Sequence, residues 1–229
     1  MPNNFPFDAV LWDMDGTLID SEPLWIEQER QLMESIGAKW TSEDAIYCVG
    51  GPMARVDAYM RSKLPTAVLD KFAPLALTNQ LLQRMEDRLS HDIPFTPGAF
   101  ELVNEMKSAN LPLALVSASS RPLMNAALKS IGSQLFDITI SDNDVERSKP
   151  DPEGYVKAAA SLDVDISRSL IIEDSITGMT AAIASGAFVL GLPHVAELPH
   201  GPKVIHHPTL ENLTMRDLAN LFSLVHERE

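Results

Sequence analysis

The sequence predicts an α/β protein in which a parallel-sheet core carries an inserted all-helical segment. Beyond residue 97, short apolar runs that suit buried strands alternate with segments of helical length. Between residues 21 and 92, by contrast, no run favours a strand. Repeated units of a strand followed by a helix imply right-handed crossovers, and therefore a parallel sheet with helices on both faces.

The first strand is predicted at residues 9–12, an uncharged and β-prone run that suits burial on both faces. The chain must leave this strand sharply at Gly16. Asp13 and Asp15 then lie at the carboxyl end of the strand, which is where open α/β sheets usually bind ligands.

The insertion is predicted to consist of helices joined by short breaks. Ser21 and Pro23 favour a helix start, and Gly37 favours the end of that helix. The pattern predicts a helix over 24–36, a short helix opening at 41–44, a break at 50–52, a helix over 53–64, and one long helix or two joined near Pro74 over 66–89.

The rest of the chain is predicted to alternate strands and helices. Strands are expected at 113–116, 136–140, 170–172 and 188–190, and helices at 100–109, 120–131, 152–162, 176–184 and 214–225. Residues 193–208 are expected to form a surface loop with a short edge strand at 203–206.

Composition restricts the function classes. The chain has 229 residues, enough for one domain with a large insertion, and its net charge of −14 repels nucleic acid and anionic membranes. A phosphorylated substrate would therefore need local cations. Cys48 is the only cysteine, lies among apolar neighbours and favours packing over reactivity. With no signal-peptide or membrane-spanning pattern, we expect a cytoplasmic protein.

Asp13 and Asp15 repel each other unless a cation lies between them or one carboxyl group holds a proton. A magnesium ion could hold one carboxylate ionised for attack on phosphorus, while the second serves as general acid and base. The alternative is an Asp-rich surface turn, because Asp and Gly commonly end strands. An EF-hand loop does not fit, since its glycine belongs at position six and a helix should precede it.

Three further strands are followed by polar residues. Ser117 and Ala118 end one strand, where small residues admit a phosphate, although Ser is also a routine helix cap. Lys149 stands before a predicted helix and is either a placed cation or a solvated surface charge. Glu173 and Asp174 are adjacent acids after a buried strand, which is costly unless a cation or hydrogen bonds compensate them.

The run Asp-Met-Asp-Gly-Thr-Leu-Ile-Asp-Ser behind a strand closely resembles the first motif of the haloacid-dehalogenase-like hydrolases. The other three motifs of this family are matched in order by three further stretches. They are Ser117 at a strand end, the Lys-Pro-Asp-Pro run at 149–152, and the Glu-Asp-Ser run at 173–175 with Gly178 after it. The last form is that of the β-phosphoglucomutase-like branch, and residues 20–25 look like its bacterial sugar and hexitol phosphate phosphatases, such as the 2-deoxyglucose-6-phosphate phosphatases. The resemblance implies a Rossmann-like core of residues 1–17 and 95–229 with a helical cap at 18–94.

The resemblance also implies roles for single residues. It makes Asp13 the nucleophile and Asp15 the acid/base; dehalogenases lack the second Asp, which argues against dehalogenation. Phosphoryl oxygens would be held by Ser117, the Ala118 amide and Lys149. The implied Mg²⁺ ligands are Asp13, the backbone carbonyl of Asp15 and Asp174, with Glu173 beside the ion through water.

Substrate selection is expected in the cap, where the sequence says less. Glu22 and Leu24 follow the first hinge and are candidates to line the entrance, although a helix start explains Glu22 equally well. Arg55 could bind a hydroxyl or a second phosphate, although a solvated helix residue is the commoner role for such an arginine.

Together these residues predict a Mg-dependent phosphatase that hydrolyses small sugar or polyol phosphate monoesters through an aspartyl phosphate. The alternatives are a β-phosphoglucomutase-type phosphomutase, a phosphoglycolate phosphatase, and a non-catalytic phosphate-binding protein. The expected partner is a small phosphorylated molecule, with neither nucleic acid nor membrane. The residues leave the oligomeric state open, while the resemblance favours a monomer.

Overall fold

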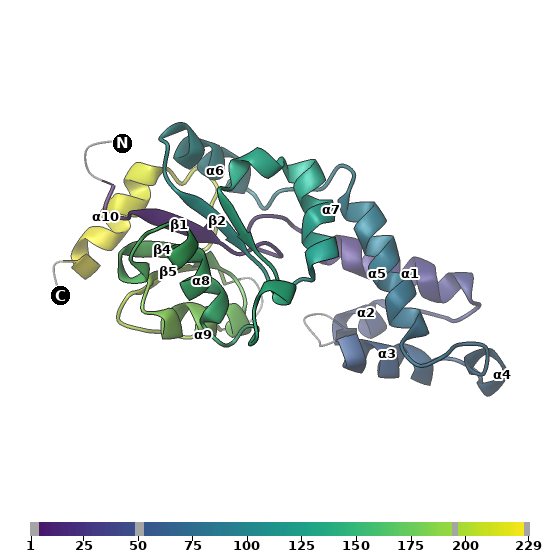
Figure 1. Cartoon of the computed structure of the whole chain (residues 1–229). Coiled ribbons are helices and arrows are strands. Elements are labelled where there is room, and N and C mark those ends of the chain that lie inside the picture. The colour runs from purple at the N-terminus through teal and green to yellow at the C-terminus, as the bar shows by residue number, and fades with distance from the viewer. Residues whose placement is uncertain (1–4, 49–52, 194–196, 227–229) are drawn as a thin grey trace.

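A computed structural model describes residues 5–48, 53–193 and 197–226, and it confirms the α/β fold with a parallel sheet. Six strands lie in the order β3-β2-β1-β4-β5-β6, and all neighbours pair in parallel. The strands are β1 (Ala9–Trp12), β2 (Leu113–Val116), β3 (Ile138–Ile140), β4 (Ser169–Glu173), β5 (Phe188–Gly191) and β6 (Val204–His206) (Figure 1).

The helices follow the predicted segments closely. They are α1 (Glu22–Ser35), α2 (Ser42–Cys48), α3 (Met53–Ser62), α4 (Thr66–Leu69), α5 (Ala76–Leu89), α6 (Ala99–Ser108), α7 (Arg121–Ile131), α8 (Glu153–Ser161), α9 (Ile176–Ser185) and α10 (Met215–His226). Of the two alternatives for 66–89, the structure has two helices: Pro74 disfavours a helical residue before it, and Leu75 is left-handed with φ 64°. The predicted break at 50–52 lies outside the described residues. No helix within them combines the length and apolar character needed to cross a membrane.

The sheet is buried on both faces because side chains alternate along each strand. On β1, Val10 and Trp12 face a core that α6, α7 and α10 cover, whereas Ala9 and Leu11 face a second core under α8 and α9. All four residues are fully buried. This burial explains why the strand is a continuous apolar run rather than an alternating one.

The chain leaves the core for the helical insertion and returns to it at the same place. Ile19 forms an antiparallel bridge with Phe95. On either side of this bridge the Asp20 amide donates to the Pro94 carbonyl and the Thr96 amide donates to the Leu18 carbonyl, each at 3.0 Å. The helices α1 to α5 therefore project together beyond one end of the sheet (Figure 1).

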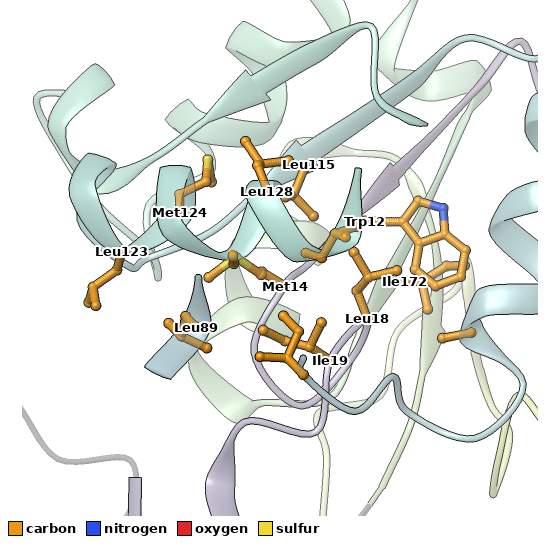
Figure 2. Close-up of a cluster of buried hydrophobic side chains, with 14 of the residues drawn as sticks. Trp12, Met14, Leu18, Ile19, Leu89, Leu115, Leu123, Met124, Leu128 and Ile172 are labelled. Atoms are coloured by element: carbon orange, nitrogen blue, oxygen red, sulfur yellow. The ribbon is translucent and has the colours of Figure 1, made fainter. Parts of the chain in front are cut away.

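The insertion is anchored on the core by α5, which packs against α7. Figure 2 shows the buried cluster at this junction, where Leu89 of α5 lies with Met14, Leu123 and other core side chains. The Ser130 hydroxyl of α7 also donates to the Leu89 carbonyl at 2.9 Å. This end of the insertion is thus part of the main hydrophobic core.

One acidic side chain in α1 is buried without a partner. Glu29 is 5% exposed, and its Oε2 has no hydrogen-bond partner. Burial raises the pKa of this carboxyl group from its ordinary 4.5 to about 7. Such a group opposes folding once it is ionised.

The Leu89→Ala substitution should lower the free energy of unfolding by about 2–5 kcal/mol, because it leaves a cavity where α5 meets α7. Urea unfolding followed by circular dichroism measures this change. Ile46→Ala is the control, since Ile46 is 70% exposed and should lose less than about 0.5 kcal/mol. Equal losses in the two variants would contradict the anchoring role of Leu89.

Glu29 should make stability depend on pH. Between about 4.5 and 7 the folded protein keeps a proton on Glu29 that the unfolded chain has released, so this residue's contribution to stability falls as pH rises through that window. The difference in Tm between Glu29→Gln and the wild type should therefore grow in favour of the variant from pH 4.5 to pH 7.5. A constant difference would show that Glu29 does not titrate in this range.

Candidate active site

The polar residues predicted at strand ends meet at one edge of the sheet. Asp13 follows β1, Ser117 follows β2, and Glu173 ends β4, and these three strands are neighbours. Because parallel strands have their carboxyl ends on the same edge, these side chains come together. Lys149 reaches the same place from the loop before α8.

Lys149 lies between two buried acids. Its Nζ is 2.5 Å from Asp13 Oδ1 and 2.7 Å from Glu173 Oε1, and it also donates to the Val116 carbonyl at 3.0 Å. The three charged side chains are between 0% and 9% exposed. Ion pairs this buried are strong only when the remaining hydrogen bonds are also made, and Lys149 makes three.

Glu173 is surrounded by donors on both carboxylate oxygens. Oε1 accepts from the Tyr155 hydroxyl at 2.8 Å as well as from Lys149. Oε2 accepts from the backbone amides of Asp174 and Ser175 at 3.0 and 3.1 Å. A Cβ at Gly178 would lie 1.6 Å from Oε1, so only glycine leaves room for this carboxylate. Glu173 therefore fixes the position of Lys149.

The pKa values follow from two buried acids sharing one lysine. Burial and the negative charge of Glu173 raise the pKa of Asp13, against the opposing charge of Lys149. Burial disfavours the charged lysine, yet Asp13 and Glu173 raise the pKa of Lys149 above its ordinary value. Burial and Glu173 also raise the pKa of Tyr155, whose hydroxyl stays a hydrogen-bond donor. One negative charge remains uncompensated, and a cation beside Asp13 would stabilise it.

The residues for such a cation are present. Asp13, Glu173 and Asp174 each present a carboxylate oxygen, and these oxygens lie within 4.8 Å of one another. Asp174 accepts a hydrogen bond from the Thr17 hydroxyl at 3.1 Å. Gly16 has φ +87°, and a Cβ there would lie 2.2 Å from Asp174 Oδ2, so this turn needs glycine. An all-oxygen set of this kind suits magnesium.

Asp15 lies in a different environment from Asp13. Its Oδ1 accepts from the Ser21 hydroxyl at 2.7 Å, and its Oδ2 accepts from the Ser119 hydroxyl at 2.7 Å and the Ser117 hydroxyl at 3.3 Å. Ser21 stands directly before α1 and the other two serines follow β2. Hydroxyl groups, rather than a lysine, thus hold the second acid.

The structure brings together Asp13, Asp15, Ser117, Lys149, Glu173 and Asp174, and Ala118 lies exposed beside Ser117. Among the described residues it does not bring the side chains of Glu22, Leu24 or Arg55 into this hydrogen-bond network. Glu22 is exposed, and Leu24 is 6% exposed in the hydrophobic core. Arg55 donates to the Tyr47 carbonyl at 3.1 Å and lies over the Tyr47 ring.

Sequence reasoning missed several residues of the network, among them Ser119, Ser21 and Tyr155. Ser119 belongs to the same polar turn as Ser117, so the turn itself was a signal. Ser21 was identified only as a helix start. Tyr155 gave no signal at all, because nothing in the spacing of α8 distinguishes it from an ordinary core aromatic residue.

Comparison with known proteins defines the class of this chain. It is 30% identical over 187 residues to the validoxylamine A 7'-phosphate phosphatase of Streptomyces hygroscopicus subsp. limoneus, covering 81% of this chain and 85% of that protein. It is 28% identical over 215 residues to hexitol phosphatase B of Escherichia coli K12, covering 92% and 96%. Other relatives are longer, and the chain spans 50% of one of them and 17% of another. The chain is a phosphoric monoester hydrolase.

The family follows from the chain as a whole. The sequence profile of the haloacid dehalogenase-like hydrolases matches residues 10–192, and the chain belongs to this family. A crystal structure of β-phosphoglucomutase from Clostridium difficile superposes with a TM-score of 0.70 at 20% identity, covering 95% of this chain and 99% of that one. That likeness shows a shared fold.

Removing Lys149 should destabilise the protein, because it leaves the repulsion between the two buried acids uncompensated. In the presence of EDTA, Lys149→Met should lower the free energy of unfolding by about 3–5 kcal/mol, because Asp13 and Glu173 then face each other uncompensated. Adding Glu173→Gln to the same chain should restore part of this loss. Urea unfolding measures both changes. Lys107→Met, which breaks the exposed pair with Asp137, is the control and should lose less than about 1 kcal/mol. A loss in Lys149→Met no larger than the control's would contradict this account.

Proposed function

We propose that this enzyme is a Mg-dependent phosphatase that hydrolyses small sugar or polyol phosphate monoesters through an aspartyl phosphate on Asp13. The observation that carries the proposal is the contrast between two acids two residues apart, Asp13 held by Lys149 and Asp15 held by hydroxyl groups. A pair of carboxyl groups in different environments suits a nucleophile and an acid/base. Relatives named as hexitol phosphatases support the substrate class.

In the first step a carboxylate oxygen of Asp13 attacks phosphorus, and the bond between phosphorus and the ester oxygen breaks. Asp15 gives its proton to the leaving oxygen, which departs as the alcohol. In the second step Asp15 takes a proton from water while the water oxygen attacks the phosphoryl group. Phosphate leaves, and Asp13 and Asp15 return to their starting states.

The remaining residues hold charge and geometry. Lys149 fixes Asp13 Oδ1 at 2.5 Å and would face the phosphoryl oxygens beside it. Ser117 and the Ala118 amide would donate to the same oxygens from the turn after β2. Fixed donors around the transferring group supply most of the rate acceleration in phosphoryl transfer.

Magnesium would be held by Asp13, Asp174 and the backbone carbonyl of Asp15. When bound it neutralises phosphate charge and keeps Asp13 ionised. Glu173 was predicted beside the ion through water, and it lies close enough for that role. Because both its oxygens already accept bonds from Lys149, Tyr155 and backbone amides, we assign it chiefly to holding Lys149.

We further propose that residues 18–94 act as a cap over a core formed by residues 1–17 and 95–229. The pairing of the two connections near Ile19 and Phe95 supports these boundaries, because both ends of the insertion meet at one hinge. A cap of this kind excludes bulk water during reaction.

Glu22 and Leu24 stay predicted entrance residues. A phosphomutase would need cap cations for a second phosphate, and Arg55, the candidate for that role, is engaged with Tyr47.

Asp13→Asn should reduce phosphate release by at least about a thousandfold, because it removes the nucleophile. Release is measured from a panel of phosphorylated sugars, polyols and glycolate, before and after removal of magnesium with EDTA. The wild type should lose release with EDTA and regain it with added Mg²⁺.

The matched control is Asp70→Asn, an exposed acid at the end of α4, which should keep wild-type rates. Full release by Asp13→Asn, or by the wild type without magnesium, would overturn the mechanism. Isomerised sugar phosphate without free phosphate would indicate a mutase instead.

A further inference from the structure

We propose that Glu29 of α1 is a specificity-determining residue that accepts hydrogen bonds from hydroxyl groups at the unphosphorylated end of the substrate. The proposal rests on the proposed phosphatase function and deepens it. It assigns this site to monophosphates with an uncharged, hydroxylated tail.

The first observation is a buried carboxylate oxygen without a hydrogen-bond partner. Glu29 is 5% exposed and its Oε2 has none. Buried polar groups are almost always paired in folded proteins. Trp12 Nε1 and Trp40 Nε1 are also buried without a partner, but a carboxylate is much more costly to leave unpaired than an indole N–H, and Glu29 therefore points to a group that arrives from outside.

The other buried acids of these helices are satisfied, which makes Glu29 an exception within its own neighbourhood. Asp44 of α2 accepts from Thr41 and Tyr59 and pairs with Lys63. Asp57 of α3 accepts from the Thr78 hydroxyl at 2.9 Å. Among the described residues of α1 to α3, Glu29 is thus the only buried acid without a protein donor.

The second observation is the position of Glu29 along α1. The helix follows Ser21, whose hydroxyl is 2.7 Å from Asp15. Glu29 is eight residues further, or about 12 Å along the axis, and helical side chains lean back toward the amino end. A substrate with its phosphate at Asp13 and its chain extended along α1 would bring its far hydroxyl groups toward Glu29.

The chemistry of the group fits such a tail. A carboxylate accepts from two hydroxyl groups, and a polyol supplies donors without adding charge. A second phosphate would instead place negative charge beside a buried acid, which is unfavourable. Glu29 would therefore favour sugar and polyol monophosphates over bisphosphates.

The test compares Glu29→Gln and Glu29→Met with the wild type and with Glu34→Gln, an exposed acid on the same helix. We measure kcat/KM for phosphate release from sorbitol 6-phosphate and from ethyl phosphate, whose tail is too short to reach Glu29. The ratio of the two values should fall by about tenfold or more in Glu29→Met, as expected for losing hydrogen bonds to a charged group. The loss should appear mainly in KM, and Glu34→Gln should keep the wild-type ratio.

A second readout separates recognition from a structural role. Without substrate, Glu29→Met should melt at the same temperature as the wild type or higher, because it removes an unpaired buried acid. An unchanged ratio in both Glu29 variants would overturn the proposal. So would a lower Tm with equal loss on both esters, because that pattern means a structural residue. If the wild type released phosphate from neither ester, the proposed function itself would fail, and this inference with it.

Discussion

The buried ion pairs of Lys149 constrain the rest of the site. A lysine surrounded by protein needs its acids in place, and Asp13 and Glu173 come from neighbouring strands. Glu173 in turn needs the Tyr155 hydroxyl, two backbone amides and the space that Gly178 leaves. The sheet register, the start of α9 and the inner face of α8 are thus linked through one ammonium group. Such a network is costly when incomplete and rigid when complete.

Asp13 and Asp15 lie in different environments although only one residue separates them. Asp13 lies in a buried, charged setting beside a lysine. Asp15 lies among hydroxyl groups of Ser21, Ser117 and Ser119, which belong to two different parts of the chain. Because Ser21 directly precedes α1, the second acid touches the base of the helical insertion. Asp15 therefore links the carboxyl edge of the sheet to the first helix of the insertion.

The sequence predicted what depends on local pattern. Strands such as Ala9–Trp12 were recognisable because burial on both faces demands a continuous apolar run. Asp13 and Asp174 were candidates because they follow such strands at a shared sheet edge, whereas Lys149 was a candidate because the run around it resembles a family motif. Tyr155 was not, since its role depends on a contact with Glu173, eighteen residues away, that no periodicity encodes. For the same reason the sequence could not distinguish Glu29 from the solvated acids of its helix.

Glu29 and Lys149 are both buried ionisable side chains, but only Lys149 is paired with charged groups of the protein. A charge removed from water must find compensation, and Lys149 finds it inside the protein. Glu29 finds none there, and the folded chain tolerates an acid whose pKa burial raises to about 7. A protein with only stability to satisfy would place an apolar residue at this position. The contacts of Lys149 are complete without a ligand. Selection among substrates, by contrast, is sharpest where a buried polar group stays unpaired until the substrate that pairs with it binds.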